Sequence, residues 1–301
     1  MEELRFDGRA AIVTGGGRGF GRQHAKLLAA RGARVVVADY GVELDGSGSS
    51  PEPAESVVAE IVDDGGEAVA CFADVSDEAG AAKIVQTAVD AFGGVDVLVN
   101  NAGISNVEWI DEVPDGQFRK MIETHYFGTV NTSRAAWPLL KRARNGCIVN
   151  TASESIIGNI PKNVDYGSAK GAVFAFTKNL ALNGRLFGIR VNGISPRGMT
   201  RMCSPEVLAK TFDAPLDSFQ GEFYDAMLPQ YASAAVGFLA HESCPLNGEV
   251  IVCGGKIAKR MAIIQTKGIT VTGDETPEDL MANIDQLMDP TDADVMTLDL
   301  F

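Results

Sequence analysis

The sequence predicts an α/β fold, a single doubly wound sheet of seven parallel strands with helices on both faces. Short apolar runs rich in β-branched residues alternate with longer stretches whose apolar residues recur at helical spacing. The short runs are apolar throughout, as expected for strands that are buried on both faces. Because crossovers between parallel strands are right-handed, the intervening helices should cover both sides of the sheet.

The first part of the chain supplies four strands and three helices. Residues 10–14 are an apolar run that ends in glycines, which predicts a strand followed by a turn. Residues 20–31 place Phe20, Leu27 and Leu28 on the buried side of a helix, and Gly32 is a typical helix end. The glycine- and serine-rich stretch 41–53 has the composition of a loop. The same alternation predicts strands at 34–39, 68–73 and 95–100 and helices at 54–64 and 78–92.

The second part of the chain continues the pattern with longer helices. Apolar residues at helical spacing predict helices over 115–141 and 164–187. Short apolar runs predict strands at 147–151, 190–194 and 250–253. No shift in composition before about Gly268 marks a second domain. We therefore expect one domain over 1–267 and an acidic C-terminal extension over 268–301.

Charge and cysteine usage exclude several classes of function. The 301 residues include 26 Lys and Arg against 40 Asp and Glu, and nine of the acids lie in 273–301, which contains no base. Nucleic acids and anionic membranes need a basic face, so neither is an expected partner. Five scattered cysteines without a C-x-x-C pair predict neither a disulfide framework nor a metal site. The N-terminus lacks the features of a signal peptide, and we expect a cytoplasmic location.

A glycine-rich turn follows the first strand and opens the first helix. Gly15, Gly19 and Gly21 punctuate TGGGRGFG, with Arg18 and Phe20 between them. Glycines let backbone amides approach a pyrophosphate, and the helix N-terminus adds partial positive charge. The turn therefore predicts a dinucleotide site on a Rossmann-type sheet.

The ends of the second and third strands supply candidate ligands for the adenosine part of the cofactor. Asp39 lies 24 residues after Gly15, and its carboxylate can accept hydrogen bonds from ribose hydroxyls while repelling a 2′-phosphate. This favours NAD over NADP, although Arg18 in the turn could pair with a 2′-phosphate. Asp74, with Val75 beside it, is expected to bond the adenine edge, or alternatively to cap the next helix.

Three side chains predict the chemistry. Tyr166 and Lys170 are four residues apart and so share one helix face, where the ammonium, together with the positive nicotinamide ring, is expected to lower the tyrosine pKa. Tyr166 would then exchange a proton with an alcohol or ketone oxygen during hydride transfer. Ser153 lies at the carboxyl end of the fifth strand, where α/β proteins bind ligands, and is expected to orient the substrate oxygen. Ser155 is the rival for that role.

Taken together, TGGGRGFG, Asn-Asn-Ala-Gly at 100–103, Ser153 and YGSAK at 166–170 resemble the short-chain dehydrogenase/reductase family over about 4–255. The resemblance implies a homodimer or homotetramer and a nicotinamide ribose bound by Lys170. It also implies cofactor contacts from Asn101, Ala102, Gly103, Pro196 and Thr200. Arg197 stands where the family usually has glycine, at the expected turn after Pro196.

His125 occupies the position of the family's usual active-site asparagine. Histidine here is similar to the subgroup with the (3R)-hydroxyacyl-CoA dehydrogenase part of peroxisomal multifunctional enzyme type 2, also called type 4 17β-hydroxysteroid dehydrogenase. LRFDGR, TSRAAW and HESC agree with that subgroup. The family role implies that the His125 carbonyl holds a water leading from Lys170, with the imidazole able to join the relay.

Two substrate classes remain open. An acyl-CoA needs cations for its phosphates, and Lys256, Lys259, Arg260, Lys267, Arg197 and Arg201 are candidates. A steroid needs an apolar cleft, which could be lined by Met199, Met202, Phe212, Leu216, Phe219, Phe223, Tyr224 and Met227. The same chemistry on a sugar, terpenoid or acyl-carrier-protein-linked substrate is an alternative. A non-enzymatic NAD sensor or scaffold is a third possibility.

Overall fold

The computed structural model describes residues 3–143, 145–271, 273–274 and 276–298, and only the backbone of Phe223 and Asp225. The chain divides into two compact units, Met1–Lys259 and Arg260–Phe301. The first unit contains the predicted strands and helices, and each unit is described by itself.

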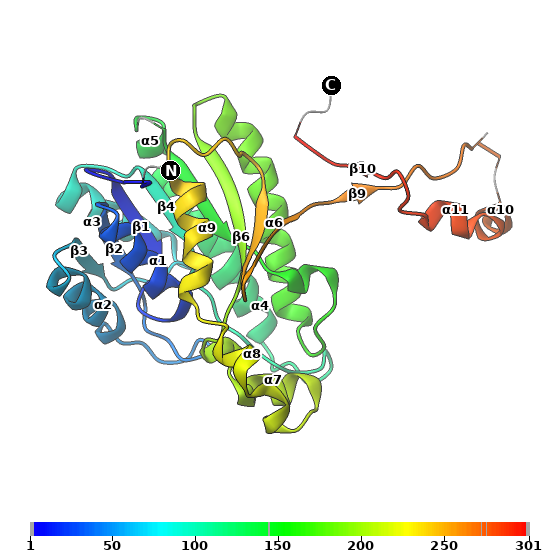
Figure 1. The fold of residues 1–301 in the computed structure, drawn as a ribbon, viewed down its shortest axis with the longest axis horizontal. Helices are drawn as coiled ribbons and strands as arrows, with labels where there is room; N and C mark the ends of the chain where they lie inside the picture. Colours follow the sequence, from blue (N-terminus) through cyan, green and yellow to red (C-terminus); the bar gives the residue numbers. More distant parts are fainter. Residues whose placement is uncertain (1–2, 144, 272, 275, 299–301) are drawn as a thin grey trace. The chain divides into compact units, whose positions relative to one another are not determined.

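The core of the first unit is a sheet with strand order β3-β2-β1-β4-β5-β6-β7-β8 (Figure 1). The seven predicted strands are present, and each pairs with its neighbours in parallel. The order reverses between β1 and β4, and α/β sheets bind ligands beside such a reversal, at the carboxyl ends of the strands. The strands are β1 (Ala10–Thr14), β2 (Arg34–Ala38), β3 (Glu67–Cys71), β4 (Val97–Asn100), β5 (Cys147–Thr151), β6 (Arg190–Arg197) and β7 (Val250–Gly254).

The predicted strand count of seven is one too low. An eighth strand, β8 (Ile257–Met261), follows β7 after a turn in which Gly255 and Lys256 both take positive φ. Its middle residues are exposed, so the run has no buried apolar pattern to identify it. The sixth strand also extends past its predicted end at 194, so Arg197 lies in the sheet instead of in a turn.

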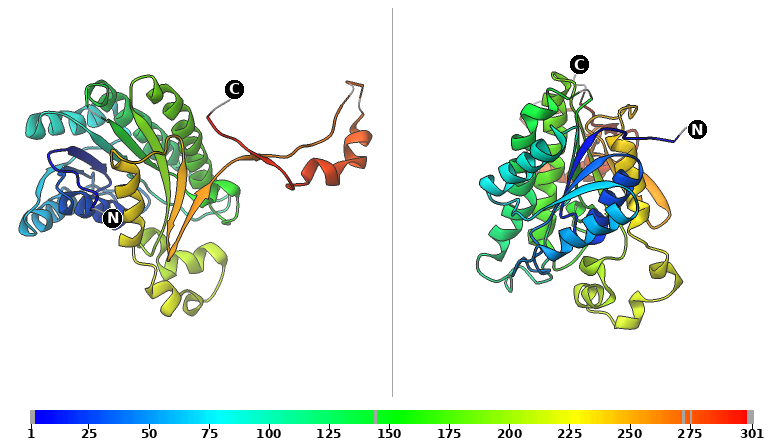
Figure 2. Two further views of the ribbon diagram at one scale, coloured as in Figure 1. Left: turned by 45° about the horizontal axis from the view of Figure 1, so that its top comes forward. Right: turned by 90° about the vertical axis from the view of Figure 1, so that its left-hand side faces the viewer.

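Helices cover both faces of the sheet (Figure 2). On one face α1 packs against α2 and α9, and on the other α3 packs against α5. Their bounds are α1 (Gly19–Ala30), α2 (Glu52–Asp63), α3 (Glu78–Phe92), α5 (Gly128–Leu140), α6 (Val164–Arg185) and α9 (Gln230–Ala240). The sequence did not predict α9, or the short helices α7 (Pro205–Phe212) and α8 (Glu222–Asp225) that precede it.

The prediction of a single helix over 115–141 is wrong in one respect. A π-helical turn, Glu123–Phe127, separates α4 (Gln117–Ile122) from α5. Such turns contain one extra residue and frequently mark functional sites. This turn carries His125, which is 2% exposed.

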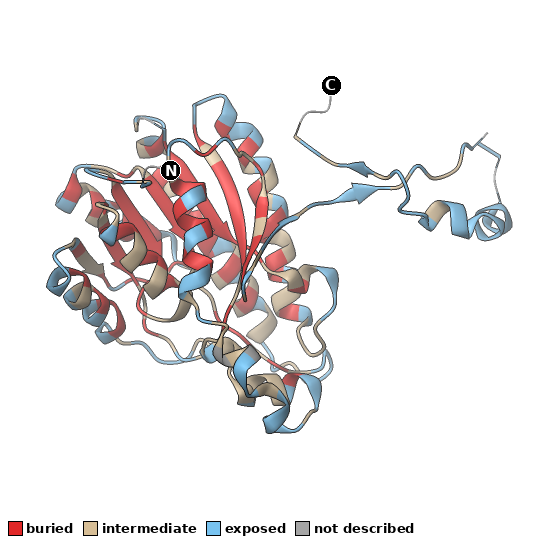
Figure 3. Cartoon of the chain, viewed as in Figure 1, coloured by how far each residue is buried: buried red, intermediate tan, exposed pale blue. Residues whose placement is uncertain are grey.

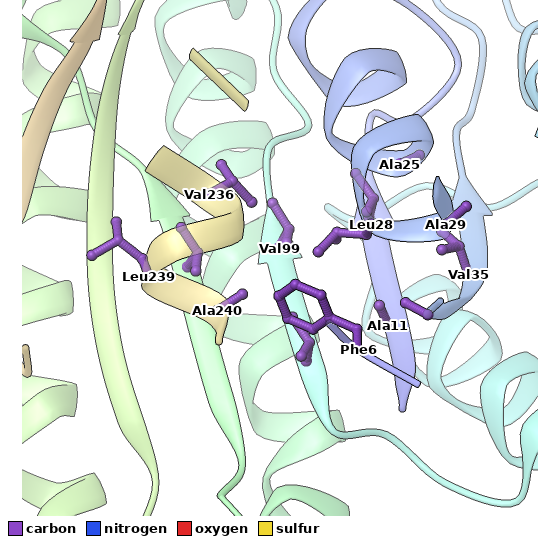
Figure 4. Close-up of a cluster of buried hydrophobic side chains, with 14 of the residues drawn as sticks. Phe6, Ala11, Ala25, Leu28, Ala29, Val35, Val99, Val236, Leu239 and Ala240 are labelled. Atoms are coloured by element: carbon purple, nitrogen blue, oxygen red, sulfur yellow. The ribbon is translucent and has the colours of Figure 1, made fainter. Parts of the chain in front are cut away.

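The hydrophobic core lies between the sheet and the helices. The central strands of the sheet, β1, β4 and β5, are buried along their whole length (Figure 3). Phe6, Leu28, Val236 and Leu239 belong to a cluster that joins α1 and α9 to the strands (Figure 4). Burial of such side chains contributes roughly 1.5–3 kcal/mol each. The sheet is therefore a rigid base for the loops at its carboxyl edge.

A buried polar network holds the opposite face. Asn100 on β4 donates to Asn150 on β5 (2.9 Å) and to Ser133 (3.1 Å), and accepts from Thr132 (2.7 Å). Asn150 in turn donates to Thr177 on α6 (3.0 Å). Because these groups are buried, their mutual hydrogen bonds offset the loss of water. The network fixes α5 and α6 against the strands that carry the site.

The second unit contains a two-residue ladder and two short helices. β9 (Ile264–Gln265) pairs antiparallel with β10 (Asp294–Val295), and α10 (Pro277–Ala282) begins at a capping box between Thr276 and Asp279. The other helix is α11 (Ile284–Met288). Across the described parts of both units, no helix is long and apolar enough to cross a membrane.

Candidate active site

The glycine-rich turn packs too tightly for side chains. A Cβ on Gly21 would lie 2.0 Å from the Gly15 carbonyl oxygen, and one on Gly15 would lie 2.7 Å from Ala102 Cα. The Asn101 amide closes the turn by donating to the carbonyls of Thr14 (3.0 Å) and Gly15 (3.1 Å). Gly21 does not line the pocket beside this turn, so its part in the predicted cofactor site is to permit the close packing.

A pocket of about 170 Å³ lies over the switch point and gathers most of the predicted cofactor residues. Those that line it are Gly15, Arg18, Gly19, Phe20, Asp39, Asp74, Val75, Asn101, Ala102, Gly103 and Thr200. Asp39 accepts hydrogen bonds from the amides of Gly17 (2.8 Å) and Gly41 (2.7 Å), which fix its carboxylate at the end of β2. The carboxylate can therefore act as an oriented acceptor.

Two arginines meet beside Asp39. Arg18 and Arg201 both donate to the carbonyl of Val42, at 3.0 and 2.9 Å. Burial and the neighbouring Arg18 charge lower the pKa of Arg201. Val42 belongs to the predicted loop 41–53, so sequence reasoning missed that this loop borders the pocket. Asp74 accepts from Ser76 (2.8 and 2.9 Å), whereas the cap of α3 is Asp77.

A second, more apolar cavity of about 400 Å³ holds the candidate catalytic residues. Ser153, Tyr166, Lys170 and His125 all line it, together with Pro196. The two cavities share Phe20, Asn101, Gly103, Thr200 and Met202. A ligand group held in one cavity therefore adjoins a group held in the other.

Ser153 lies near enough to Tyr166 for its hydroxyl to lower the pKa of the tyrosine, and Lys170 lies one helical turn beyond Tyr166. The Lys170 Nζ donates to the Thr151 carbonyl (2.6 Å) and lies 5.6 Å from the Tyr166 ring centroid. Ser153 is the N-cap of a short 3₁₀ segment and accepts from the Ser155 amide (3.2 Å). Ser155 itself is buried and is not among the residues that line the cavity.

Burial has the largest effect that the chain itself exerts on the pKa of Tyr166. Burial raises the pKa of Tyr166 above its ordinary value, and the Ser153 hydroxyl opposes this only in part. Burial also lowers the pKa of Lys170 to about 7, so the ammonium is a weak source of positive charge at neutral pH. The free site therefore keeps Tyr166 protonated.

His125 fits against Gly103. Its Nε2 lies 2.8 Å from the Ile104 carbonyl oxygen, and its ring meets the Tyr166 ring edge-on at 5.1 Å. A Cβ on Gly103 would lie 2.3 Å from the imidazole Cε1. Burial, with the Lys170 charge, holds the pKa of His125 well below its usual value, so the imidazole is neutral. The His125 carbonyl accepts from Thr129 (2.8 Å).

Buried polar atoms without a protein partner concentrate around this cavity. Of the seven such atoms in the described part of the chain, His125 Nδ1, Thr151 Oγ1 and Asn163 Oδ1 belong to residues that line the cavity, and Ser155 Oγ lies two residues from Ser153. Such groups are costly to bury unsatisfied, and they are common at sites that bind water or ligand. Among the described residues, no cluster of His, Cys, Asp or Glu could hold a metal ion.

The apolar lining agrees largely with the predicted set. Met199, Met202, Phe212, Phe219, Tyr224 and Met227 line the cavity, whereas Leu216 does not. The side chain of Phe223 lies outside the described part of the chain. Sequence reasoning missed Glu154 and Cys203, which line the same cavity.

The basic residues proposed for CoA phosphates differ in their surroundings. Arg197 pairs with Glu154, Arg201 bonds Val42, and Lys267 pairs with Asp294 (2.7 Å) within the second unit. Arg260 belongs to the second unit as well. Lys256 follows Gly255, where a Cβ would lie 3.7 Å from Met227 of the cavity wall. Lys256 and Lys259 lie in the first unit, and neither forms an ion pair or side-chain hydrogen bond with another described residue.

The sequence profile of the short chain dehydrogenase family matches residues 9–206. A short-chain type dehydrogenase/reductase of Mycobacterium tuberculosis is 34% identical over 300 residues, covering 95% of this chain and 96% of that protein. Peroxisomal multifunctional enzyme type 2 of Mus musculus is 36% identical over 294 residues, which cover 96% of this chain but 38% of that longer protein.

Two solved structures resemble the whole chain. A short chain dehydrogenase of Mycobacterium avium has a TM-score of 0.78 and 35% identity, covering 95% of this chain and 96% of that one. The full-length peroxisomal multifunctional enzyme type 2 of Drosophila melanogaster has a TM-score of 0.76 and 29% identity, covering 97% of this chain and 47% of that one.

Proposed function

This chain belongs to the short-chain dehydrogenase family, and from that premise we propose that it interconverts a secondary alcohol and a ketone with NAD. The observation that carries the proposal is the shared wall between the two cavities. Ser153, Tyr166 and Lys170 line one of these cavities and the glycine-rich turn lines the other, which supports the proposal.

The residues present fit a dinucleotide. The close-packed turn at Gly15 leaves backbone exposed toward the pocket, and Asp39 offers a fixed carboxylate at the end of β2. A carboxylate there favours ribose hydroxyls over a 2′-phosphate, which supports NAD. The guanidinium groups of Arg18 and Arg201 are held by the Val42 carbonyl. As cations they favour a 2′-phosphate, and therefore NADP.

In this proposal Tyr166 moves the proton and Ser153 orients the reacting oxygen by hydrogen bonding. Bound nicotinamide supplies or accepts the hydride. Oxidation of an alcohol requires the Tyr166 phenolate, and burial opposes that state in the free protein. Charging Lys170 favours the phenolate, because a nearby cation stabilises it. The neutral His125 contributes its unpaired Nδ1 as a hydrogen-bonding group for water or substrate.

We favour a (3R)-hydroxyacyl-CoA as the substrate, with a 17β-hydroxysteroid as the second candidate. The cavity lining of methionines and aromatic side chains suits either apolar group. Lys256, next in sequence to Gly255 at the cavity wall, and Lys259 offer cations for CoA phosphates and favour the acyl-CoA. The relatives named peroxisomal multifunctional enzyme type 2 bear the name of the subgroup that His125 resembles, which also supports the acyl-CoA.

A substrate panel tests this choice. Purified protein with NAD is given a medium-chain (3R)-hydroxyacyl-CoA, a 17β-hydroxysteroid or a sugar alcohol, and NADH formation is measured. We expect turnover of the acyl-CoA, with KM raised several-fold in a Lys256→Ala/Lys259→Ala variant. A steroid preference unaffected by those substitutions would replace the first candidate with the second. NAD binding without turnover of any alcohol would favour a sensor.

We also propose a homo-oligomer in a reducing compartment such as the cytoplasm. Leu182, Leu186 and Phe187 leave an exposed apolar patch near the end of α6, of the kind that pairs subunits. All five cysteines are free. Sedimentation velocity of the purified protein tests the first statement, for which a monomer would be the contrary result.

A further inference from the structure

Arg197 and Glu154 form a two-pronged ion pair in the wall of the substrate cavity. Arg197 Nε lies 2.5 Å from Glu154 Oε2, and Nη2 lies 2.6 Å from Oε1. Both residues line the cavity, and their side chains are 38% and 26% exposed. A bidentate pair fixes orientation as well as distance. The sequence separation of 43 residues means that the pair joins two distant elements, the end of β6 and the segment after β5.

The two partners differ in how firmly the backbone holds them. Arg197 is the last residue of β6 and is in register with Gly254 of β7. A Cβ on Gly254 would lie 1.8 Å from the Arg197 carbonyl oxygen, so the strands are in close contact there. Glu154 instead begins a four-residue 3₁₀ segment, whose Ile157 is 68% exposed. The sheet is therefore the anchor, and the Glu154 segment is the part that is held.

The residue before Glu154 is Ser153, the last residue before that segment. Its hydroxyl has the Ser155 amide as a local partner, at 3.2 Å. The backbone contact between the Ile156 amide and the Ser153 carbonyl is long, at 3.4 Å. Local bonds of this kind hold the serine weakly, because the segment that makes them is only four residues long and one of its bonds is long.

We propose that Arg197 is a positioning residue that acts through Glu154 to hold the Ser153 hydroxyl against Tyr166. The inference rests on the proposed function, since it assigns an anchor to the serine of that site. It also explains the arginine at a place where the resembled family has glycine. Because Glu154 neutralises the guanidinium, Arg197 is a tether to Ser153 and not a free cation for substrate phosphates.

Kinetics of two single variants test the tether. Glu154→Gln and Arg197→Gln should each lower kcat about tenfold, while KM and the Kd for NAD stay within about threefold. The double variant Glu154→Arg/Arg197→Glu should recover part of the lost kcat. Glu60→Gln is the matched control, because Arg22 and Glu60 form a similar pair at 2.5 Å with 34% and 31% exposure, away from both cavities. It should leave kcat unchanged.

Two results would overturn the inference. One is an unchanged kcat in Glu154→Gln. The other is a raised KM in Arg197→Gln alone, which would mean that Arg197 contacts the substrate directly.

Hydrogen exchange supplies a readout that does not depend on turnover. The Ser155 amide, which donates to Ser153, should exchange faster in Glu154→Gln than in wild type or Glu60→Gln. If the Ser155 amide exchanges faster in Glu154→Gln but the wild-type protein oxidises no alcohol, the tether is supported and the proposed function is rejected. Unchanged exchange would reject the tether even in an active enzyme.

Discussion

Replacing Gly103 with alanine tests how His125 is held in the site. The added Cβ would lie 2.3 Å from the imidazole Cε1, about 1.1 Å short of the 3.4 Å at which ordinary contact begins. The ring has little freedom to retreat, because it is 2% exposed and its Nε2 lies 2.8 Å from the Ile104 carbonyl oxygen. Overpacking of this kind costs about 1–3 kcal/mol. We expect Gly103→Ala to lower the free energy of unfolding by about 2 kcal/mol.

A double-mutant cycle separates this clash from a general effect of the substitution. His125→Ala alone should also destabilise, since it leaves a cavity beside Tyr166 and an unpaired Ile104 carbonyl. In Gly103→Ala/His125→Ala the new methyl group enters the vacated space. The double variant should therefore lose less unfolding free energy than the sum of the two single variants, by about 1.5 kcal/mol or more. Urea unfolding followed by circular dichroism measures each free energy. Additivity within about 0.5 kcal/mol would refute the contact.

Three further predictions concern other parts of the molecule. Asp39→Ala should lower the ratio of kcat/KM with NAD to that with NADP by about tenfold, because it removes the charge that repels a 2′-phosphate. An unchanged ratio would argue against its assigned role. His24 is fully buried with its pKa lowered by burial to about 3, so the unfolded state gains a proton first as pH falls below about 6.5. Unfolding free energy should therefore drop by about 1.4 kcal/mol more in wild type than in His24→Gln between pH ~8 and pH ~5.5, as measured in urea. Asn100→Ala should cost about 3 kcal/mol in the same assay, because it leaves Asn150 and its neighbours unpaired; a loss below about 1 kcal/mol would contradict the network.

The parallel sheet could be predicted because its strands are apolar on both faces and their lengths are set by flanking glycines. The strand at 147–151 and the helix at 78–92 agree with the structure to the residue. The π-helical turn could not be predicted, because one extra residue barely changes the apolar spacing around His125. β8 could not be predicted either, because an exposed edge strand has no pattern of buried apolar residues to detect.

The candidate site was predictable where neighbouring residues in sequence form it. Tyr166 and Lys170 share a helix, and Ser153 follows the end of β5, so the topology alone brings them to one edge of the sheet. The ion pair of Arg197 with Glu154 links distant residues, and the direction of the Tyr166 pKa shift depends on burial by many residues. Neither depends on local spacing, so neither could be derived from it.

The most direct test of the account is NADH formation by wild type and Tyr166→Phe, measured side by side with NAD and a medium-chain (3R)-hydroxyacyl-CoA. Removing the hydroxyl leaves the ring against His125 but takes away the group that moves the proton. The account predicts turnover in wild type, loss of at least about a hundredfold in the variant, and equal NAD affinity in calorimetry. Turnover retained in Tyr166→Phe would contradict the central role given to this residue.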